Sequence, residues 1–424
     1  HLDPGYESGG VADCDAPTCC RKGNSPPAGH WGDYRDCDTP IWAISRNNVS
    51  KPFQNIDAIY YIGDTIDHHS WETTYEAIND MNRYVVEKIR HNFGPNVLVI
   101  PVVGNHEAQP TNQFAPPHIT GEKINTTWLY DALADKWGSY LSEEAMVTLR
   151  ERGQFSVLVR PGLRAISVNN IVAYRDNWWI VYDPQDAKRH LEWLVDELYK
   201  AERAGEKVHI LAHIPPGVAD LNYYWTREYN RIINRFSSTI VAEFNGHTHS
   251  DEFKIFYSAA GEPSMVAWGG GSATTYSHYN LNYKVATFNP DTFVSAHDTT
   301  YAYNLTEANL TQDRRPHWFQ LYNMTNSFSI PDLTPATMDN LVTSMVSTAP
   351  HLLDMYSAFY SKLGDNRLAS CDAECKIDNL CKTVVTVLWE RERCDRLRDR
   401  LSTASVSPGP SSEKKTGSKK RPKF

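Results

Sequence analysis

The segment VLVIPVVGNHE, residues 97–107, decides how this sequence is expected to fold. Its first seven residues are apolar and mostly β-branched, so they predict a buried β-strand. The strand ends at Gly104, and the polar residues Asn105 and His106 follow at once. A glycine turn between a buried strand and metal-capable side chains suggests a site at the edge of an α/β sheet.

Three more apolar runs end in the same way. They are residues 58–62, followed by Gly63 and Asp64, residues 208–212, followed by His213, and residues 240–244, which lead to Gly246, His247 and His249. His68 follows Asp64 by four residues, and His1 and Asp3 stand at the start of the sequence. Strand ends converge on one edge of an α/β sheet, so these residues are expected to meet in one cleft.

The pattern around these runs predicts an α/β fold over residues 1–300, a layered β-sandwich flanked by helices. Residues 73–92 and 186–204 read as amphipathic helices, and residues 155–168 as a hairpin that turns at Pro161 and Gly162. Residues 301–401 are expected to form a smaller α-helical C-terminal domain. The stretch 402–424 is rich in Ser, Pro, Gly and Lys, and it reads as a disordered basic tail.

Composition and charge exclude several classes of protein. The 424 residues are 41% hydrophobic and 22% charged, which is enough apolar material for a large core. No apolar run reaches the roughly 18 residues that a membrane-spanning helix needs. The formal net charge is −9 although residues 413–424 are strongly basic, so the body of the protein is acidic. An acidic body has no broad cationic face for nucleic acid.

The cysteines indicate an oxidising compartment. All eight lie in two tight groups, so pairing within the groups leaves nine possible disulfide patterns, and neither group has a paired zinc-binding spacing. The first group is Cys14, Cys19, Cys20 and Cys37, and the second is Cys371, Cys375, Cys381 and Cys394. Five N-glycosylation sequons point the same way, at Asn48, Asn125, Asn304, Asn309 and Asn323. Together these features favour a secreted or lysosomal protein.

The donor set at the strand ends predicts the chemistry. One aspartate, one asparagine and several histidines suit two zinc-like ions bridged by a carboxylate. The sequence contains none of the motifs of a P-loop, a helical zinc protease or a serine hydrolase elbow. A lone histidine is more often a surface or core residue, but the same signature at four strand ends makes coincidence improbable.

The motifs resemble those of the calcineurin-like metallophosphoesterases. The matching segments are Gly63-Asp64, residues 104–107 (GNHE) and residues 246–249 (GHTH), in this order and spacing. Residues 31–38 (WGDYRDCD), 213–217 (HIPPG), 272–276 (SATTY) and 316–318 (PHW), with the cysteine groups, narrow the resemblance to the acid sphingomyelinase family. The family's Asp-x-His motif and its saposin domain would both begin before His1.

The resemblance implies roles for individual residues. One metal would be held by His1, Asp64 and His249, and the other by Asp64, Asn105, His213 and His247. His106 and His68 would face the substrate as catalytic residues, with Glu107 and Tyr276 binding it. The implied disulfides are Cys14–Cys19, Cys20–Cys37, Cys371–Cys375 and Cys381–Cys394.

These roles predict a zinc phosphodiesterase, with two Zn²⁺ per chain, that hydrolyses sphingomyelin to ceramide and phosphocholine at acidic pH. His106 is the first choice as general acid, with His68 as its partner or substitute. The expected partners are sphingomyelin or a related phosphodiester and a peripheral membrane surface, with no nucleic acid. The alternatives are a secreted phosphodiesterase acting on nucleotides or CDP-choline-like diesters, and a non-catalytic lipid binder.

Overall fold

The computed structural model describes residues 1–23, 26–45, 56–276, 278–365 and 370–406. Its centre is a six-stranded sheet in the order β5-β6-β7-β8-β10-β9. The strands are β5 (Phe155–Arg160), β6 (Leu163–Val168), β7 (Lys207–Ala212), β8 (Ile240–Asn245), β10 (Pro263–Gly269) and β9 (Phe253–Tyr257). The four middle strands are parallel and the two edge strands antiparallel.

Three smaller sheets complete the β-structure. Strands β3 (Ala58–Tyr61) and β4 (Leu98–Pro101) form a parallel pair, as do β1 (Leu2–Asp3) and β2 (Thr39–Pro40). Strands β11 (Asn282–Phe288), β12 (Ser295–Ala302) and β13 (Phe319–Asn323) form an antiparallel sheet. The prediction of a layered α/β fold is therefore confirmed.

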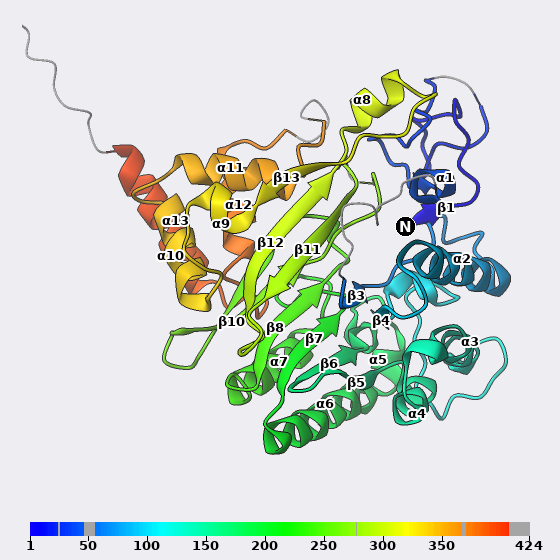
Figure 1. Ribbon diagram of the computed structural model, residues 1–424, viewed down its shortest axis with the longest axis horizontal. Coiled ribbons are helices and arrows are strands. Elements are labelled where there is room, and N and C mark those ends of the chain that lie inside the picture. The colour runs from blue at the N-terminus through cyan, green and yellow to red at the C-terminus, as the bar shows by residue number, and fades with distance from the viewer. Residues whose placement is uncertain (24–25, 46–55, 277, 366–369, 407–424) are drawn as a thin grey trace, which may run out of the picture.

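The helices surround these sheets, and Figure 1 shows α10–α13 at the opposite end of the molecule from α1–α4. The α-helices are α1 (Ile41–Ser45), α2 (Tyr75–Phe93), α3 (Thr127–Trp137), α4 (Glu143–Arg152), α5 (Trp179–Tyr182), α6 (Pro184–Ala204), α7 (Tyr223–Arg235), α8 (Leu305–Leu310), α9 (Met324–Phe328), α10 (Pro335–Met345), α11 (His351–Tyr360), α12 (Ala373–Lys382) and α13 (Glu392–Val406). Short 3₁₀ turns lie at Asn105–Glu107, Gly138–Tyr140 and Asn170–Ala173.

Helix α6 shows why the local sequence folds as it does. Asp183 caps its first turn, Pro184 occupies the first helical position, and Gly205 ends it with φ of 70°. The leucines predicted to share one face, at 191, 194 and 198, are all buried against the central sheet. The predicted helices and strands of residues 58–244 are present, with ends shifted by one or two residues.

Alternate residues of the central sheet face two different cores. On β10, Met265 and Ala267 belong to the core that includes α6 and α7, whereas Val266 and Trp268 belong to the core that includes α10–α13. The C-terminal helices thus cover the face of the sheet that α6 and α7 leave open. This packing holds β8 rigidly between two layers, and the loop after β8 carries two of the predicted metal ligands.

The structure confirms the four predicted disulfides, Cys14–Cys19, Cys20–Cys37, Cys371–Cys375 and Cys381–Cys394. The disordered tail was predicted to begin at residue 402, but α13 continues to Val406. Residues 407–424 lie outside the described part of the chain. Within the described residues, no helix has both the length and the apolar character needed to cross a membrane.

The predicted glycosylation sites differ in accessibility. Asn304 is exposed and caps α8 through its side-chain oxygen. By contrast, Nδ2 of Asn309 donates to the carbonyl of Gly32, and Nδ2 of the buried Asn323 donates to Thr299. Asn125 is half-buried and its Nδ2 donates to nearby carbonyls, while Asn48 lies outside the described residues. A glycan is therefore most easily accommodated at Asn304.

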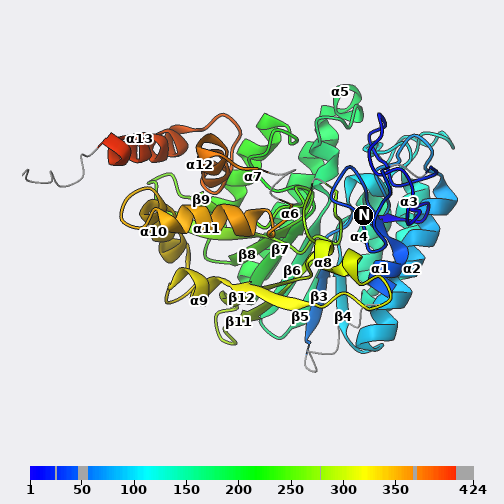
Figure 2. The same ribbon diagram turned by 90° about the horizontal axis from the view of Figure 1, so that it is seen from above.

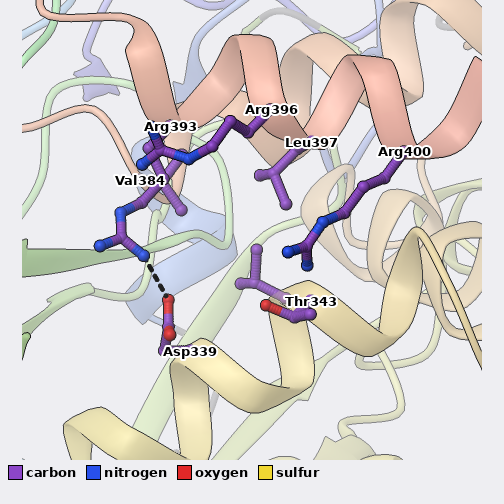
Figure 3. A pocket seen from close by; sticks show the side chains of 8 residues that line it. Asp339, Thr343, Val384, Arg393, Arg396, Leu397 and Arg400 are labelled. Atoms are coloured by element: carbon purple, nitrogen blue, oxygen red, sulfur yellow. Dashed lines mark hydrogen bonds and ion pairs between the residues drawn. The ribbon is translucent and has the colours of Figure 1, made fainter. Parts of the chain in front are cut away.

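A cavity of about 240 Å³ lies between α10 and α13, and Arg393, Arg396 and Arg400 of α13 line it (Figure 3). Arg393 pairs with Asp339 across it, with 3.3 Å between their charged atoms. None of the predicted site residues lines this cavity. The candidate site lies elsewhere, at the ends of the parallel strands.

Candidate metal centre and active site

All the predicted ligands except His1 lie directly after four strands. Asp64 follows β3, Asn105 follows β4, His213 follows β7, and His247 and His249 follow β8. Asp64, His247 and His249 have φ of 59°, 68° and 57°. Non-glycine residues rarely adopt this left-handed conformation, and such strain is concentrated at functional sites.

His213 and His1 each anchor one ring nitrogen to the backbone and turn the other towards Asp64. Nδ1 of His213 is 2.6 Å from the carbonyl of Ile62, and its Nε2 is 2.8 Å from Asp64 Oδ2. Nδ1 of His1 is 2.8 Å from the carbonyl of Ile66. Its Nε2 is buried 3.3 Å from Asp64 Oδ2 and has no other polar partner among the described residues. Metal-binding histidines are held by the same kind of outer N–H contact, so these residues fit a divalent cation.

Asn105 presents its side-chain oxygen to the same centre. Its Oδ1 is 3.1 Å from Nε2 of His213 and 3.0 Å from Nδ1 of His247. Its Nδ2 donates to Oδ1 of Asn112 at 2.8 Å, which fixes the orientation of the amide. The oxygen is therefore available as a hard ligand beside two imidazole nitrogens.

Three sets of described side chains bring potential ligand atoms within 4.8 Å of one another: Asp64, His213 and His247; His1, Asp64 and His106; and His1, His68 and His249. The first set matches three of the four ligands predicted for one metal. For the other metal, His249 groups with His1 and His68, whereas His106 takes its place beside Asp64. The structure thus brings the predicted ligands into one cluster, in which His249 lies with His1 and His68 and not in a set with Asp64, and ligand histidines are not separated from catalytic ones.

Asp64 carries the negative charge at the middle of the site. Burial opposes its ionisation, but His213, His1 and His106 outweigh burial and hold the pKa of Asp64 well below its ordinary value. Burial likewise opposes protonation of His1, yet the Asp64 carboxylate raises the pKa of His1 to about 9. Charge attraction thus holds the rings of His1 and His213 beside the Asp64 carboxylate at the middle of the site.

Glu107 stabilises the loops that contain Asp64 and Asn105 through hydrogen bonds. Its buried carboxylate accepts hydrogen bonds from the backbone N–H groups of Gly104, Asp64 and Thr65, at 2.7, 3.0 and 2.6 Å. A Cβ at Gly104 would collide with the Asp64 carboxylate, so this position requires glycine. The substrate contact that we predicted for Glu107 does not match this placement, because the carboxylate faces the loop backbone beneath the ligands.

His68 forms a dyad with Asp38. Nδ1 of His68 is 2.9 Å from Asp38 Oδ1, and the backbone N–H of His68 donates to Oδ2 at 2.7 Å. The hydroxyl of Thr274 also donates to this buried carboxylate. Burial raises the pKa of Asp38, but the charges of His68 and His1 reverse this and hold it well below the ordinary value. An ionised Asp38 thus orients His68 as a triad aspartate orients its histidine.

His106 and Tyr276 complete the surroundings of His68. The ring of His106 meets that of His68 edge-on at 4.6 Å, and Tyr276 stacks on His68 with centroids 4.0 Å apart. Burial lowers the pKa of His106 to about 3, against the opposing attraction of Asp64. Burial therefore disfavours the protonated form of His106, and its role as the general acid stays a prediction.

Sequence reasoning missed three residues that orient site side chains: Asp38, Asn112 and Asp220. Asp38 stands in the segment 31–38 that carried the family resemblance, so a signal for it was present. Asn112 and Asp220 lie in loops without a recognisable pattern, and only the fold places them beside Asn105 and His247.

Comparisons with known proteins agree with this geometry. The family model for calcineurin-like phosphoesterases matches residues 30–251, and that for the acid sphingomyelin phosphodiesterase C-terminal region matches residues 271–394. Three relatives, which the chain matches over 90% of its length, are sphingomyelin phosphodiesterase of Homo sapiens (37% identity), sphingomyelin phosphodiesterase B of Dictyostelium discoideum (34%) and sphingomyelin phosphodiesterase 1 of Caenorhabditis elegans (33%).

These matches cover 61%, 61% and 68% of the lengths of the three relatives, respectively. The chain therefore belongs to the calcineurin-like phosphoesterases and, within them, to the acid sphingomyelin phosphodiesterase family.

Proposed function

We propose that this chain is a zinc-dependent phosphodiesterase that hydrolyses sphingomyelin to ceramide and phosphocholine at acidic pH, in a secreted or lysosomal setting. The observation that carries the proposal is the placement of Asp64 between the inward-facing nitrogens of His1 and His213. The three relatives named above support the choice of substrate, because each is a sphingomyelin phosphodiesterase by name.

We propose two zinc ions, because imidazole, carboxylate and amide ligands together suit zinc. Asp64 would be shared, with His1 and His249 on one side and Asn105, His213 and His247 on the other. When bound, such a pair of cations supplies Lewis-acid polarisation of the phosphate and lowers the pKa of water.

The protein's own residues supply the proton for the leaving group and hold the proton donor in its orientation. Cleavage of the bond between phosphorus and the ceramide oxygen leaves an alkoxide that must take up a proton. His68 is suited to donate it, because Asp38 holds its Nδ1–H and leaves Nε2 for the substrate. Tyr276, stacked on His68, is fixed by a hydrogen bond from its hydroxyl to the carbonyl of Pro17 at 2.9 Å. We assign His106, beside Asp64, to contact with the bound phosphodiester.

The direct test is an assay of the purified chain at about pH 5 on sphingomyelin dispersed in detergent micelles. We expect release of phosphocholine, loss of activity with a chelator and recovery with Zn²⁺. Elemental analysis should find two zinc ions per chain. Parallel assays with a dinucleotide and CDP-choline separate the alternative phosphodiesterases. Zinc-loaded protein that cleaves only these soluble diesters, or none at all, would rule out the proposed substrate.

An exposed apolar rim beside the metal centre supports contact with a membrane surface. Tyr174 packs edge-on against the ligand His247, with ring centroids 5.7 Å apart. The chain then runs into α5, which projects from the body of the molecule (Figure 2). Trp178, Val181 and Tyr182 are 75%, 84% and 64% exposed there. Aromatic and aliphatic side chains left in water next to a lipid-hydrolysing site are suited to insert into the interfacial region of a bilayer.

The double variant Trp178→Ser/Val181→Ser is therefore expected to bind sphingomyelin vesicles about tenfold more weakly, which corresponds to a loss of ~1.4 kcal/mol. Sedimentation with vesicles measures the binding. Activity on a short-chain, soluble sphingomyelin should change little. Leu158→Ser is the matched control. Leu158 is exposed on β5 near the β5–β6 hairpin, at the end of the sheet opposite the strand ends that carry the candidate site. Equal vesicle binding by the double variant and the wild type would show that α5 does not contribute to the membrane contact.

A further inference from the structure

Both ring nitrogens of His247 face oxygen atoms. Nδ1 is 3.0 Å from Oδ1 of Asn105, and Nε2 is 3.2 Å from Oδ2 of Asp220. A neutral imidazole carries one N–H, so it can donate to only one of these two oxygens. The identity of that oxygen decides whether Nδ1 or Nε2 keeps its lone pair for a cation.

Asp220 lies in the loop between β7 and α7, and contacts with the segment around Arg175 fix its position. Its backbone carbonyl accepts a hydrogen bond from the N–H of Arg175 at 2.8 Å. The guanidinium of Arg175 also lies 3.5 Å from Oδ1 of Asp220, whereas His247 faces the other carboxylate oxygen, Oδ2. Tyr174 and Leu221 form a β-bridge across the same two segments. The side chain of Asp220 is 28% exposed, so water screens its contact with His247 only in part.

The two oxygens are unequal acceptors. Asp220 offers a carboxylate, and hydrogen bonds to a charged acceptor are about twice as strong as those to a neutral amide oxygen. Nε2–H is therefore the favoured tautomer, donated to Asp220. Nδ1 then directs its lone pair towards Asn105 Oδ1, and two electron-rich ligand atoms 3.0 Å apart match neighbouring ligands of one cation.

We infer that Asp220 is a positioning residue for the metal centre, which fixes the Nε2–H tautomer of His247 so that Nδ1 is presented as a ligand. The inference rests on the metal site of the proposed function. It goes beyond the predicted ligand set, in which Asp220 had no part. Outer carboxylates of this kind typically change metal affinity by 10- to 100-fold when they are removed.

The test compares Asp220→Ala and Asp220→Asn with the wild type in two measurements. Competition between the protein and a chromophoric chelator gives the affinity for Zn²⁺. Long-range ¹H–¹⁵N spectra of the histidine rings give the tautomer of His247. We expect Asp220→Ala to bind one of the two ions about 10- to 100-fold more weakly and to lose the pure Nε2–H signature. Asp220→Asn keeps an acceptor oxygen and should recover part of both.

Asp176→Asn is the matched control, because Asp176 is a neighbouring acid that also contacts Arg175, at 3.7 Å, whereas Asp220 is the acid that pairs with His247. It should retain wild-type zinc affinity. Unchanged zinc affinity and an unchanged His247 tautomer in Asp220→Ala would overturn the inference. Failure of the proposed function would be seen differently, because the wild-type chain itself would then bind no zinc. The tautomer of His247 would still show whether Asp220 controls the orientation of the ring.

Discussion

Replacement of His68 by alanine is expected to lower kcat for sphingomyelin by about 10²- to 10⁴-fold, the usual loss when a positioned general acid is removed. The reason is the dyad, in which the buried carboxylate of Asp38 holds Nδ1 of His68 at 2.9 Å. Among the described residues no carboxylate holds Nδ1 of His106, which faces the backbone carbonyl of Asp67 at 3.1 Å, and burial lowers the pKa of His106 to about 3. His106→Ala should therefore leave more activity than His68→Ala on a substrate whose leaving group needs a proton.

A substrate with a leaving group of low pKa, such as a p-nitrophenyl diester, separates the two roles. His68→Ala should recover most of its activity on this substrate, because the departing phenolate needs no proton. His69→Ala is the control, since Nε2 of His69 pairs with Glu72 at 3.0 Å, away from the site. Zinc content must be measured for each variant, because His68 lies near His1 and His249. Equal losses on both substrates, with zinc retained, would show that His68 does not donate the proton.

Replacement of Glu243 by glutamine is expected to stabilise the protein at pH 8 by up to ~3 kcal/mol and to have little effect near pH 4.5. Glu243 is buried on β8, and its carboxyl accepts hydrogen bonds from the hydroxyl of Tyr229 at 2.9 Å and Nδ2 of Asn245 at 3.0 Å. Burial raises the pKa of Glu243 from 4.5 to about 7, because these hydrogen bonds and the charge of Lys254 compensate only in part.

A carboxyl with a raised pKa binds its proton more tightly in the folded state than in the unfolded chain. Its contribution to stability is therefore fully present below about pH 4.5 and is lost as the pH rises through about 7. Glutamine stays neutral and keeps a similar shape, so the variant should lose this part of the pH dependence. Urea unfolding of both proteins at pH 4.5 and pH 8 measures the difference, with the exposed Glu262→Gln as control. If the variant and the wild type differed by the same free energy of unfolding at pH 4.5 and at pH 8, the prediction would be wrong.

Much of the site could be predicted because its signals are local. Five of the six predicted ligands, all except His1, lie just after a run of apolar residues, as His213 follows β7, and strand ends of an α/β sheet meet at one edge. The cysteines formed two groups, and the family resemblance selected among the nine local pairings. The role of Glu107 could not be predicted in this way, because a conspicuous motif position does not reveal which way a carboxylate points.

Other features depended on residues that are distant in the sequence. Asp38 meets His68 across 30 positions and Asp220 meets His247 across 27. The lowered pKa of His106 also follows from its surroundings, since burial and the charges of His1 and His68 outweigh the attraction of Asp64.

The sequence by itself determined the class of fold, the candidate ligands at the strand ends and the two cysteine groups, because hydrophobic periodicity and turn residues act over a few neighbouring positions. Only the tertiary structure decided which nitrogen of each histidine faces the centre, which histidine has a carboxylate partner and which carboxyl is held neutral in the core. Hydrogen-bond direction and the free energy of burying a charge depend on groups that the chain brings together only when it folds.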